Sequence, residues 1–223
     1  MTPSGPWSAF APAVHTTCEP AVAGWIAHPA DTVSALAYLL TAILARRLAP
    51  AIAARVALVG VMAVGFHATG TDFMQRLDLA AVILLNGHLL VWALIRSGHG
   101  AAERRRAMEV AIAAIPAVAG FLFSWLGYVI GAVEALTALA LWQRLAGTTP
   151  AVRHDVRWIA GLVLPGSILL GLGHLGIGCV TGAATHIVQP HVIWHVASAI
   201  ACMIICRMDR TLRQSTTLPP PTR

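Results

Sequence analysis

Long apolar runs separated by short polar connections dominate this chain. Each run is long enough and poor enough in charge to form a membrane helix, because about 20 apolar residues in helical conformation cross the hydrocarbon of a bilayer. The runs cover residues 32–45, 56–70, 78–95, 108–124, 126–143, 158–178 and 190–206. The first is the shortest, and either Asp31 or Thr32 can cap its first turn. The pattern therefore predicts an all-α fold, a seven-transmembrane helix bundle.

The composition agrees with a membrane protein. Of 223 residues, 57% are hydrophobic and 11% are charged, whereas about 25% of the residues of a soluble domain are charged. This length leaves no space for a second sizeable domain, so we expect residues 1–223 to form a single membrane domain. Residues 1–31 are expected to be an extramembrane N-terminal segment without the basic start of a cleaved signal peptide. Residues 207–223 are expected to be a cytoplasmic tail with a disordered end.

The arginines are distributed unevenly between the connections. All of the 15 basic residues except Arg76 follow the first, third, fifth or seventh run. The positive-inside rule then places the N-terminus outside and the C-terminus in the cytoplasm. The net charge of +6 thus reflects membrane orientation, and we expect no nucleic-acid partner. Richness in alanine and arginine without any lysine indicates a GC-rich prokaryotic source and therefore a bacterial inner membrane.

Three histidines and one aspartate inside the runs are the candidate chemistry. His191 and His195 lie four residues apart, so a helix presents both imidazoles on one face. His67 lies near the outer end of the second run and Asp78 near the outer start of the third, which predicts that all four groups meet at a similar depth. Because ionisable groups in a membrane are costly and imidazole suits zinc, we expect a metal site. The alternative is a structural polar cluster that joins helices.

The same residues resemble a known family. His67-Ala68-Thr69, Asp78 eleven residues after His67, and the pair His191 and His195 are similar to motifs of the alkaline ceramidases. These enzymes belong to a membrane hydrolase superfamily that also includes adiponectin-type and progestin receptors. Cys18-Glu19-Pro20 and the stretch over residues 31–38 resemble the N-terminal signature of that family. The resemblance extends over essentially the whole chain.

The resemblance implies a function and a role for each matching residue. His67, His191 and His195 match the zinc ligands, and Asp78 matches the catalytic carboxylate. The implied activity is zinc-dependent cleavage of ceramide, or of a related N-acyl lipid in the bilayer, to a fatty acid and a free amine. The resemblance also implies a disulfide between Cys18 and Cys179. Both lie outside in the predicted topology, where oxidation is permitted.

Two departures from the family pattern affect these expectations. Ala63 stands one turn before His67, where the family usually has a serine, so activity is expected to be reduced or supported differently. His28 stands where a glutamate is common in calcium-binding members, and Glu19 is the remaining candidate calcium ligand. We therefore disfavour calcium and expect zinc as the cofactor.

Two other classes of function remain open. The chain can be a receptor-like or lipid-binding protein with a structural metal, in which Ala63 marks lost catalysis. It can also be a proton or ion transporter that uses its histidines as a relay.

Several other polar and sulfur-containing side chains have weaker assignments. His174 and His186 are interpreted as solvated loop histidines, and Glu134 as an isolated intramembrane carboxylate that is functional or paired with another helix. Cys202 and Cys206 are interpreted as buried packing residues.

Overall fold

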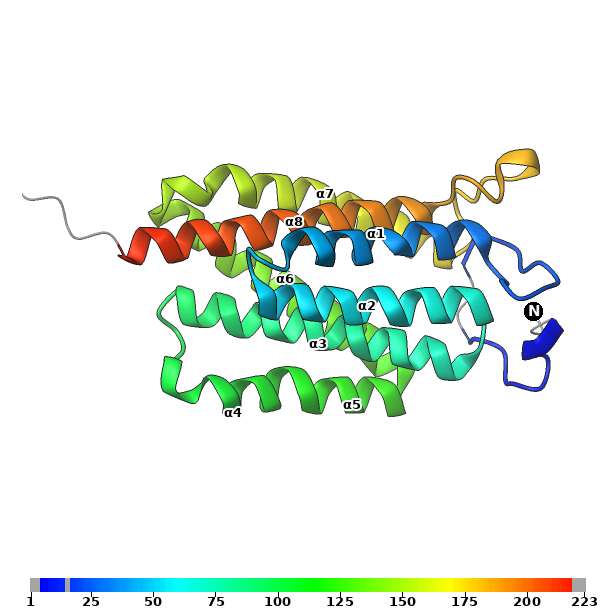
Figure 1. Ribbon diagram of the computed structural model, residues 1–223, viewed down its shortest axis with the longest axis horizontal. Helices are drawn as coiled ribbons and strands as arrows, with labels where there is room; N and C mark the ends of the chain where they lie inside the picture. Colours follow the sequence, from blue (N-terminus) through cyan, green and yellow to red (C-terminus); the bar gives the residue numbers. More distant parts are fainter. Residues whose placement is uncertain (1–4, 15–16, 218–223) are drawn as a thin grey trace, which may run out of the picture.

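The chain folds as a bundle of helices. The computed structural model describes residues 5–14 and 17–217, which contain no strand. The helices, shown in Figure 1, are α1 (Pro29–Ala45), α2 (Pro50–Thr69), α3 (Asp72–Arg96), α4 (Arg105–Glu109), α5 (Ile115–Leu122), α6 (Ser124–Thr148), α7 (Pro150–His174) and α8 (Pro190–Thr217). A π-helical turn, η3 (Val110–Ala114), joins α4 to α5, so residues 105–122 form one interrupted segment. Short 3-10 turns lie at η1 (Gly5–Trp7), η2 (Ala102–Arg104) and η4 (Gly182–Ala184).

The lengths and compositions of the helices confirm an all-α, multi-pass membrane protein. Among the described residues, the 5 helices α2, α3, α6, α7 and α8 are long and apolar enough to cross a membrane. The remaining segments differ: α1 is apolar but has 17 residues, and the segment over 105–122 is interrupted by its π turn. The seven-span count and the orientation of the termini stay predictions.

Several helices extend beyond the apolar runs. α2 begins at Pro50 and α7 at Pro150, well before the predicted starts, because proline suits the first turn of a helix, where its missing N–H is not needed. α7 ends at His174, four residues before the approximate end expected for the sixth run, and Gly176 and Gly178 beyond it have positive φ. α8 continues to Thr217, so the first part of the expected cytoplasmic tail is helical. Of the predicted disordered end over 217–223, Thr217 is the last residue of α8, and the other residues lie outside the described part of the chain.

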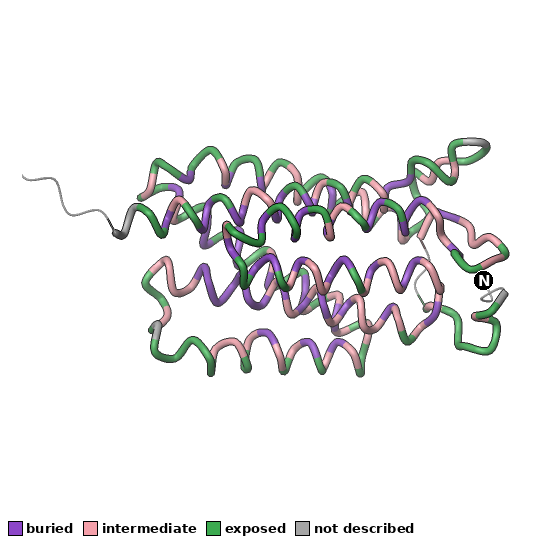
Figure 2. Tube along the Cα trace, in the orientation of Figure 1, coloured by how far each residue is buried: buried purple, intermediate pink, exposed green. Residues whose placement is uncertain are grey.

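The interior lies between α1, α2, α3, α6 and α8. α1 packs against α2 and α8, α7 against α8, and α3 against α2 and α6. Figure 2 shows buried positions concentrated on the inward faces of these helices. Large apolar side chains on the outward faces, such as Leu136 on α6 and Ile168 on α7, are exposed. Such an apolar surface is what a bilayer covers.

The N-terminal segment crosses one end of the bundle. Backbone hydrogen bonds tie it to the connection between α2 and α3, with Ala13 N–H donating to Gly70 O at 2.9 Å and His28 N–H donating to His67 O at 3.0 Å. A disulfide, Cys18–Cys179, ties it to the connection between α7 and α8. Figure 1 shows both segments at the same end. They cover the end where His67 and the start of α8 lie.

Candidate metal centre

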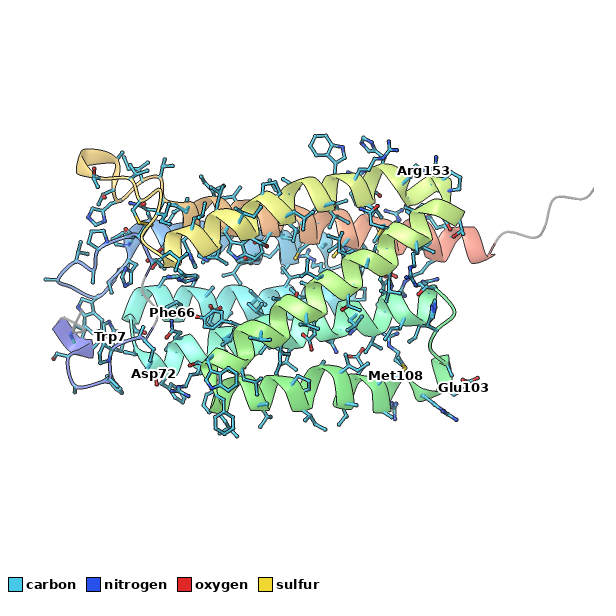
Figure 3. All side chains as sticks on the ribbon, turned by 180° about the vertical axis from the view of Figure 1, so that it is seen from behind. Trp7, Phe66, Asp72, Glu103, Met108 and Arg153 are labelled. Atoms are coloured by element: carbon cyan, nitrogen blue, oxygen red, sulfur yellow. A yellow bond between two sulfur atoms is a disulfide. The ribbon has the colours of Figure 1, made fainter. Side chains whose placement is uncertain are left out.

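The three predicted histidines come together. His67 is in the last turn of α2, while His191 and His195 occupy the first two turns of α8. His67 Nε2 lies 3.2 Å from His191 Nε2, and one ring nitrogen of each histidine lies within 4.8 Å of the others. Phe66, labelled in Figure 3, packs its ring against that of His67 at a centroid distance of 4.6 Å. The convergence predicted from helix spacing and depth is confirmed.

A serine on α1 orients His195. Ser34 Oγ lies 2.8 Å from His195 Nδ1 and donates its proton to Asp31 O at 3.0 Å. Because a hydroxyl has a single proton, the hydrogen bond to His195 must be donated by Nδ1–H. This tautomer leaves the lone pair of His195 Nε2 available to a metal, as in sites where the other ring nitrogen bonds to a neighbouring oxygen.

Asp31 is the corresponding neighbour of His67. Asp31 Oδ2 lies 3.8 Å from His67 Nδ1, and both side chains are fully buried. His67 Nδ1 has no hydrogen-bond partner among the described residues, and neither Asp31 oxygen has one of good geometry, although the Thr17 hydroxyl acts on that carboxylate. A shift of less than 1 Å would bring these atoms within hydrogen-bonding distance. The donor set and these two buried groups fit a metal held by Nε2 of His67, with its Nδ1–H donating to the carboxylate.

The expectation that Asp31 or Thr32 caps the first membrane helix is wrong. Thr32 Oγ1 donates to His28 O at 2.7 Å, and the Asp31 carboxylate accepts no backbone N–H. The cap is Glu19, from outside the helix, whose two oxygens accept Ala30 N–H at 3.0 Å and Asp31 N–H at 2.9 Å. A carboxylate in this position is favoured because the start of a helix carries unpaired N–H groups and a partial positive charge.

Glu19 also belongs to a second group of possible ligands. One ligand atom each of Glu19, His28 and Asp31 lies within 4.8 Å of the others, so this group could also hold a metal ion. His28 Nδ1 donates to Glu19 O at 3.0 Å, and burial lowers the pKa of His28 below its ordinary value. His186 Nδ1 donates to Glu19 Oε1 at 2.9 Å. His186 is therefore a partner of Glu19 and not a simple solvated loop histidine.

Asp78 approaches the site less directly than predicted. Within the described residues, it forms no hydrogen bond or ion pair with the three histidines, and its Oδ1 is buried without a partner. Its carboxylate lies in electrostatic range of the Tyr38 phenol, and the Tyr38 ring centroid is 5.7 Å from that of His195. Asp78 thus acts electrostatically on a side chain that packs near His195, and no hydrogen bond or ion pair among the described residues joins it to the histidines.

An apolar cavity lies near the histidines, although none of the three lines it. It measures about 120 Å³ and lies between α1, α2, α3, α6, α7 and α8. Tyr38, Trp194 and Ser198 line it near the site, and Trp142 and Ile205 line it toward the opposite end. Its lining includes the following further residues: Val59, Val82, Leu85, Asn86, Leu89, Ala135, Ala138, Leu139, Ile159, Val163, Ser167, Ala201 and Cys202. A hydrocarbon chain suits such a lining.

The predicted disulfide is present, with a Cα–Cα distance of 5.2 Å between Cys18 and Cys179. Cys202 and Cys206 are buried and free, which confirms their interpretation as packing residues. His174 differs from its prediction, because it ends α7 and its ring centroid lies 6.0 Å from that of His191. It belongs to the surroundings of the site.

Sequence reasoning assigned no role to Ser34 or Tyr38. Their spacing in the sequence could have indicated a role. Polar residues recur every three or four positions, which places them on one face of α1: Asp31, Ser34, Tyr38 and Thr41. That face packs on α8, where Tyr38 bonds to Ser198 Oγ and Thr41 donates to Ala199 O. A polar stripe on an apolar helix indicates a contact with another polar element.

No family model and no curated protein matches the chain. The resemblance to the alkaline ceramidases therefore rests only on the residues named above.

Proposed function

We propose that this protein is a zinc-dependent intramembrane amidohydrolase that cleaves ceramide, or a related N-acyl lipid, to a fatty acid and a free amine. The observation that carries the proposal is the convergence of His67, His191 and His195 close to an apolar cavity, whose lining residue Tyr38 has its ring centroid 5.7 Å from that of His195. Buried histidines within a membrane bundle are costly and are generally functional. A bacterial inner membrane, with the histidines toward its outer side, is the proposed location.

The histidines supply a ligand set that suits catalytic zinc. Three neutral imidazoles leave a fourth position for water or substrate. Zinc in such a site supplies Lewis-acid activation of water and of a carbonyl oxygen. Ser34 keeps the ring of His195 in the orientation that leaves Nε2 available to the metal, and Asp31 would do the same for His67 once its carboxylate accepts His67 Nδ1–H.

The cavity supports a lipid substrate. An acyl or long-chain base entering among Leu85, Leu139 and Ile205 stays in an apolar environment, and its amide then lies at the end where Tyr38 and Ser198 meet the histidines. The surrounding helices exclude bulk water from that end, which strengthens the electrostatic contacts made there.

Asp78 is the proposed proton carrier. Its Oδ1 has no hydrogen-bond partner among the described residues, so the carboxylate is available to take a proton from the attacking water. Returning this proton to the nitrogen of the scissile amide allows the amine to leave. Ser34 and Tyr38 have assigned hydrogen bonds, and Asp78 therefore is the better candidate for this step.

The second candidate is a lipid-binding or receptor-like protein with a structural metal. Ala63 favours it, because this residue is buried one turn before His67 and brings no hydroxyl to the centre. In that case the bundle binds an N-acyl lipid and retains the metal but does not hydrolyse the amide.

Metal analysis combined with a panel of N-acyl lipids separates the two candidates. We expect detergent-purified protein to carry a zinc-to-protein ratio of about one and to release fatty acid from ceramide. A His195→Ala variant is expected to lose both properties. Retained zinc without hydrolysis of any N-acyl lipid would favour the structural metal, and protein that binds no metal would reject both candidates.

A further inference from the structure

A second cavity lies at the end of the bundle away from the histidines. It measures about 200 Å³, and its lining combines three arginines with one carboxylate and two apolar side chains, as follows: Trp92, Ile95, Arg96, Arg105, Asp209 and Arg213. These residues come from the end of α3, the start of α4 and the last turns of α8. Glu103 and Met108, labelled in Figure 3, mark this end of the bundle.

Both oxygens of the carboxylate in this cavity accept hydrogen bonds. Asp209 is completely buried, and its Oδ1 accepts Trp92 Nε1–H at 2.7 Å. Arg213 bonds to Asp209 Oδ2 at 2.8 Å, and Arg96 lies 3.5 Å from Oδ1. Charge-assisted hydrogen bonds of this kind hold both guanidinium groups at the cavity wall.

Arg105 adds positive charge that the lining does not balance. Its ion pair is with Glu109, at 3.7 Å, and Glu109 also pairs with Arg55 at 3.2 Å and with His88 at 2.6 Å. Glu109 is not part of the cavity lining. Within the lining, three guanidinium groups face one carboxylate, Asp209, and the partner of Arg105 is Glu109 outside the lining.

The positive-inside distribution alone does not account for this cluster. Arg207 and Arg210 of α8 lie outside the cavity, as arginines that only mark a membrane surface do. Arg96, Arg105 and Arg213 instead converge on one concave space from three separate elements. Convergent guanidinium groups match the geometry of a phosphate, to which they donate in pairs.

We propose that this cavity binds the phosphate group of an anionic membrane phospholipid. The guanidinium groups of Arg96, Arg105 and Arg213 contact the phosphate oxygens, and Trp92 and Ile95 contact the adjoining glycerol and acyl carbons. Basic pockets between membrane helices are known binding sites for such head groups. The bound phosphate links α4 to α8, two elements that are far apart in the sequence.

Lipid retention by the reconstituted full chain tests the proposal. The protein is incorporated into nanodiscs of phosphatidylcholine with increasing phosphatidylglycerol, and the lipid kept after extraction is counted by native mass spectrometry. The test variant is Arg105→Gln, since this side chain is 44% exposed and has only a long ion pair. The control is Arg210→Gln, which removes the same charge from an exposed site on α8.

We expect Arg105→Gln to retain phosphatidylglycerol about fivefold more weakly, and Arg210→Gln to match the unmodified protein. Equal loss in both variants, or in neither, overturns the proposal. Thermal unfolding in detergent distinguishes the source of the phosphate: short-chain phosphatidylglycerol should raise the Tm, while inorganic phosphate at the same concentration should not. An equal rise with inorganic phosphate overturns the lipid assignment, because the site then takes the free anion.

Discussion

Ser34 Oγ lies 2.8 Å from His195 Nδ1, and this hydrogen bond sets which nitrogen of the histidine faces the site. The serine gives its only proton to Asp31 O, so the imidazole donates and its Nε2 keeps a free lone pair. A contact between α1 and α8 thereby prepares a ligand for a centre that also includes His67 of α2.

Removing this hydroxyl should weaken metal binding without unfolding the bundle. We expect Ser34→Ala to lower zinc affinity about 10- to 100-fold, as loss of an oxygen that orients a metal-ligating histidine does. Competition with a chelator measures the affinity. Thr41→Ala is the control, because Thr41 lies on the same face of α1 but bonds to Ala199 O, away from the histidines. Equal zinc affinity in Ser34→Ala and the unmodified protein would contradict the role given to the serine.

Replacing the carboxylate of Asp78 should separate binding from catalysis. We expect Asp78→Asn to retain zinc, because Asp78 does not contact the histidines, and to lose about 100- to 10,000-fold in kcat on an N-acyl lipid. The matched control is Asp72→Asn, which affects an aspartate on the same helix that pairs with Arg76. If Asp78→Asn instead loses zinc and keeps its kcat per metal-loaded molecule, Asp78 is not the proton carrier.

The cavity should determine the length of the chain that the protein accepts. Ala201 lines the cavity three turns beyond the start of α8 and is buried, so Ala201→Leu fills part of the space. We expect this variant to prefer N-acyl lipids with shorter chains, measured as the ratio of kcat/KM between short and long substrates. Ile200→Leu changes a neighbouring exposed residue and should leave the ratio unaltered. An unchanged ratio in Ala201→Leu would show that the chain lies elsewhere.

The buried carboxylate of Glu134 is expected to lower the free energy of unfolding of the protein. It is buried on α6, and both of its oxygens are without a hydrogen-bond partner among the described residues. Because burying an unpaired polar group is unfavourable by about 1–3 kcal/mol, Glu134→Leu should raise the free energy of unfolding by a similar amount. Thermal or denaturant unfolding in detergent measures it, with the exposed Glu103→Leu as control. Lower stability of Glu134→Leu would indicate a partner that the carboxylate needs.

The helices and the metal centre were predictable to different degrees. Apolar runs located the membrane helices, and the spacing of His191 and His195 with the depth of His67 predicted their convergence. Depth along the membrane does not fix which faces of neighbouring helices meet, however. Asp78 was expected at the depth of His67, but among the described residues no hydrogen bond or ion pair joins it to the histidines.

Contacts made by distant segments were not predictable from local pattern. Asp31 and Thr32 were the candidate helix caps because they stand at the start of an apolar run, but Glu19 accepts the N–H groups there from the preceding segment. Only the folded arrangement, closed by the Cys18–Cys179 disulfide, brings Glu19 there. It also frees Asp31 to face His67.

X-ray absorption spectroscopy of the zinc-loaded protein tests the central claim most directly, because it reports the atoms bound to the metal. We expect three imidazole nitrogens at about 2.0–2.1 Å with one further oxygen, and one imidazole fewer, or no bound zinc, in a His67→Ala variant. A spectrum with sulfur ligands at about 2.3 Å, or one that His67→Ala leaves unchanged, would contradict a zinc centre built from His67, His191 and His195.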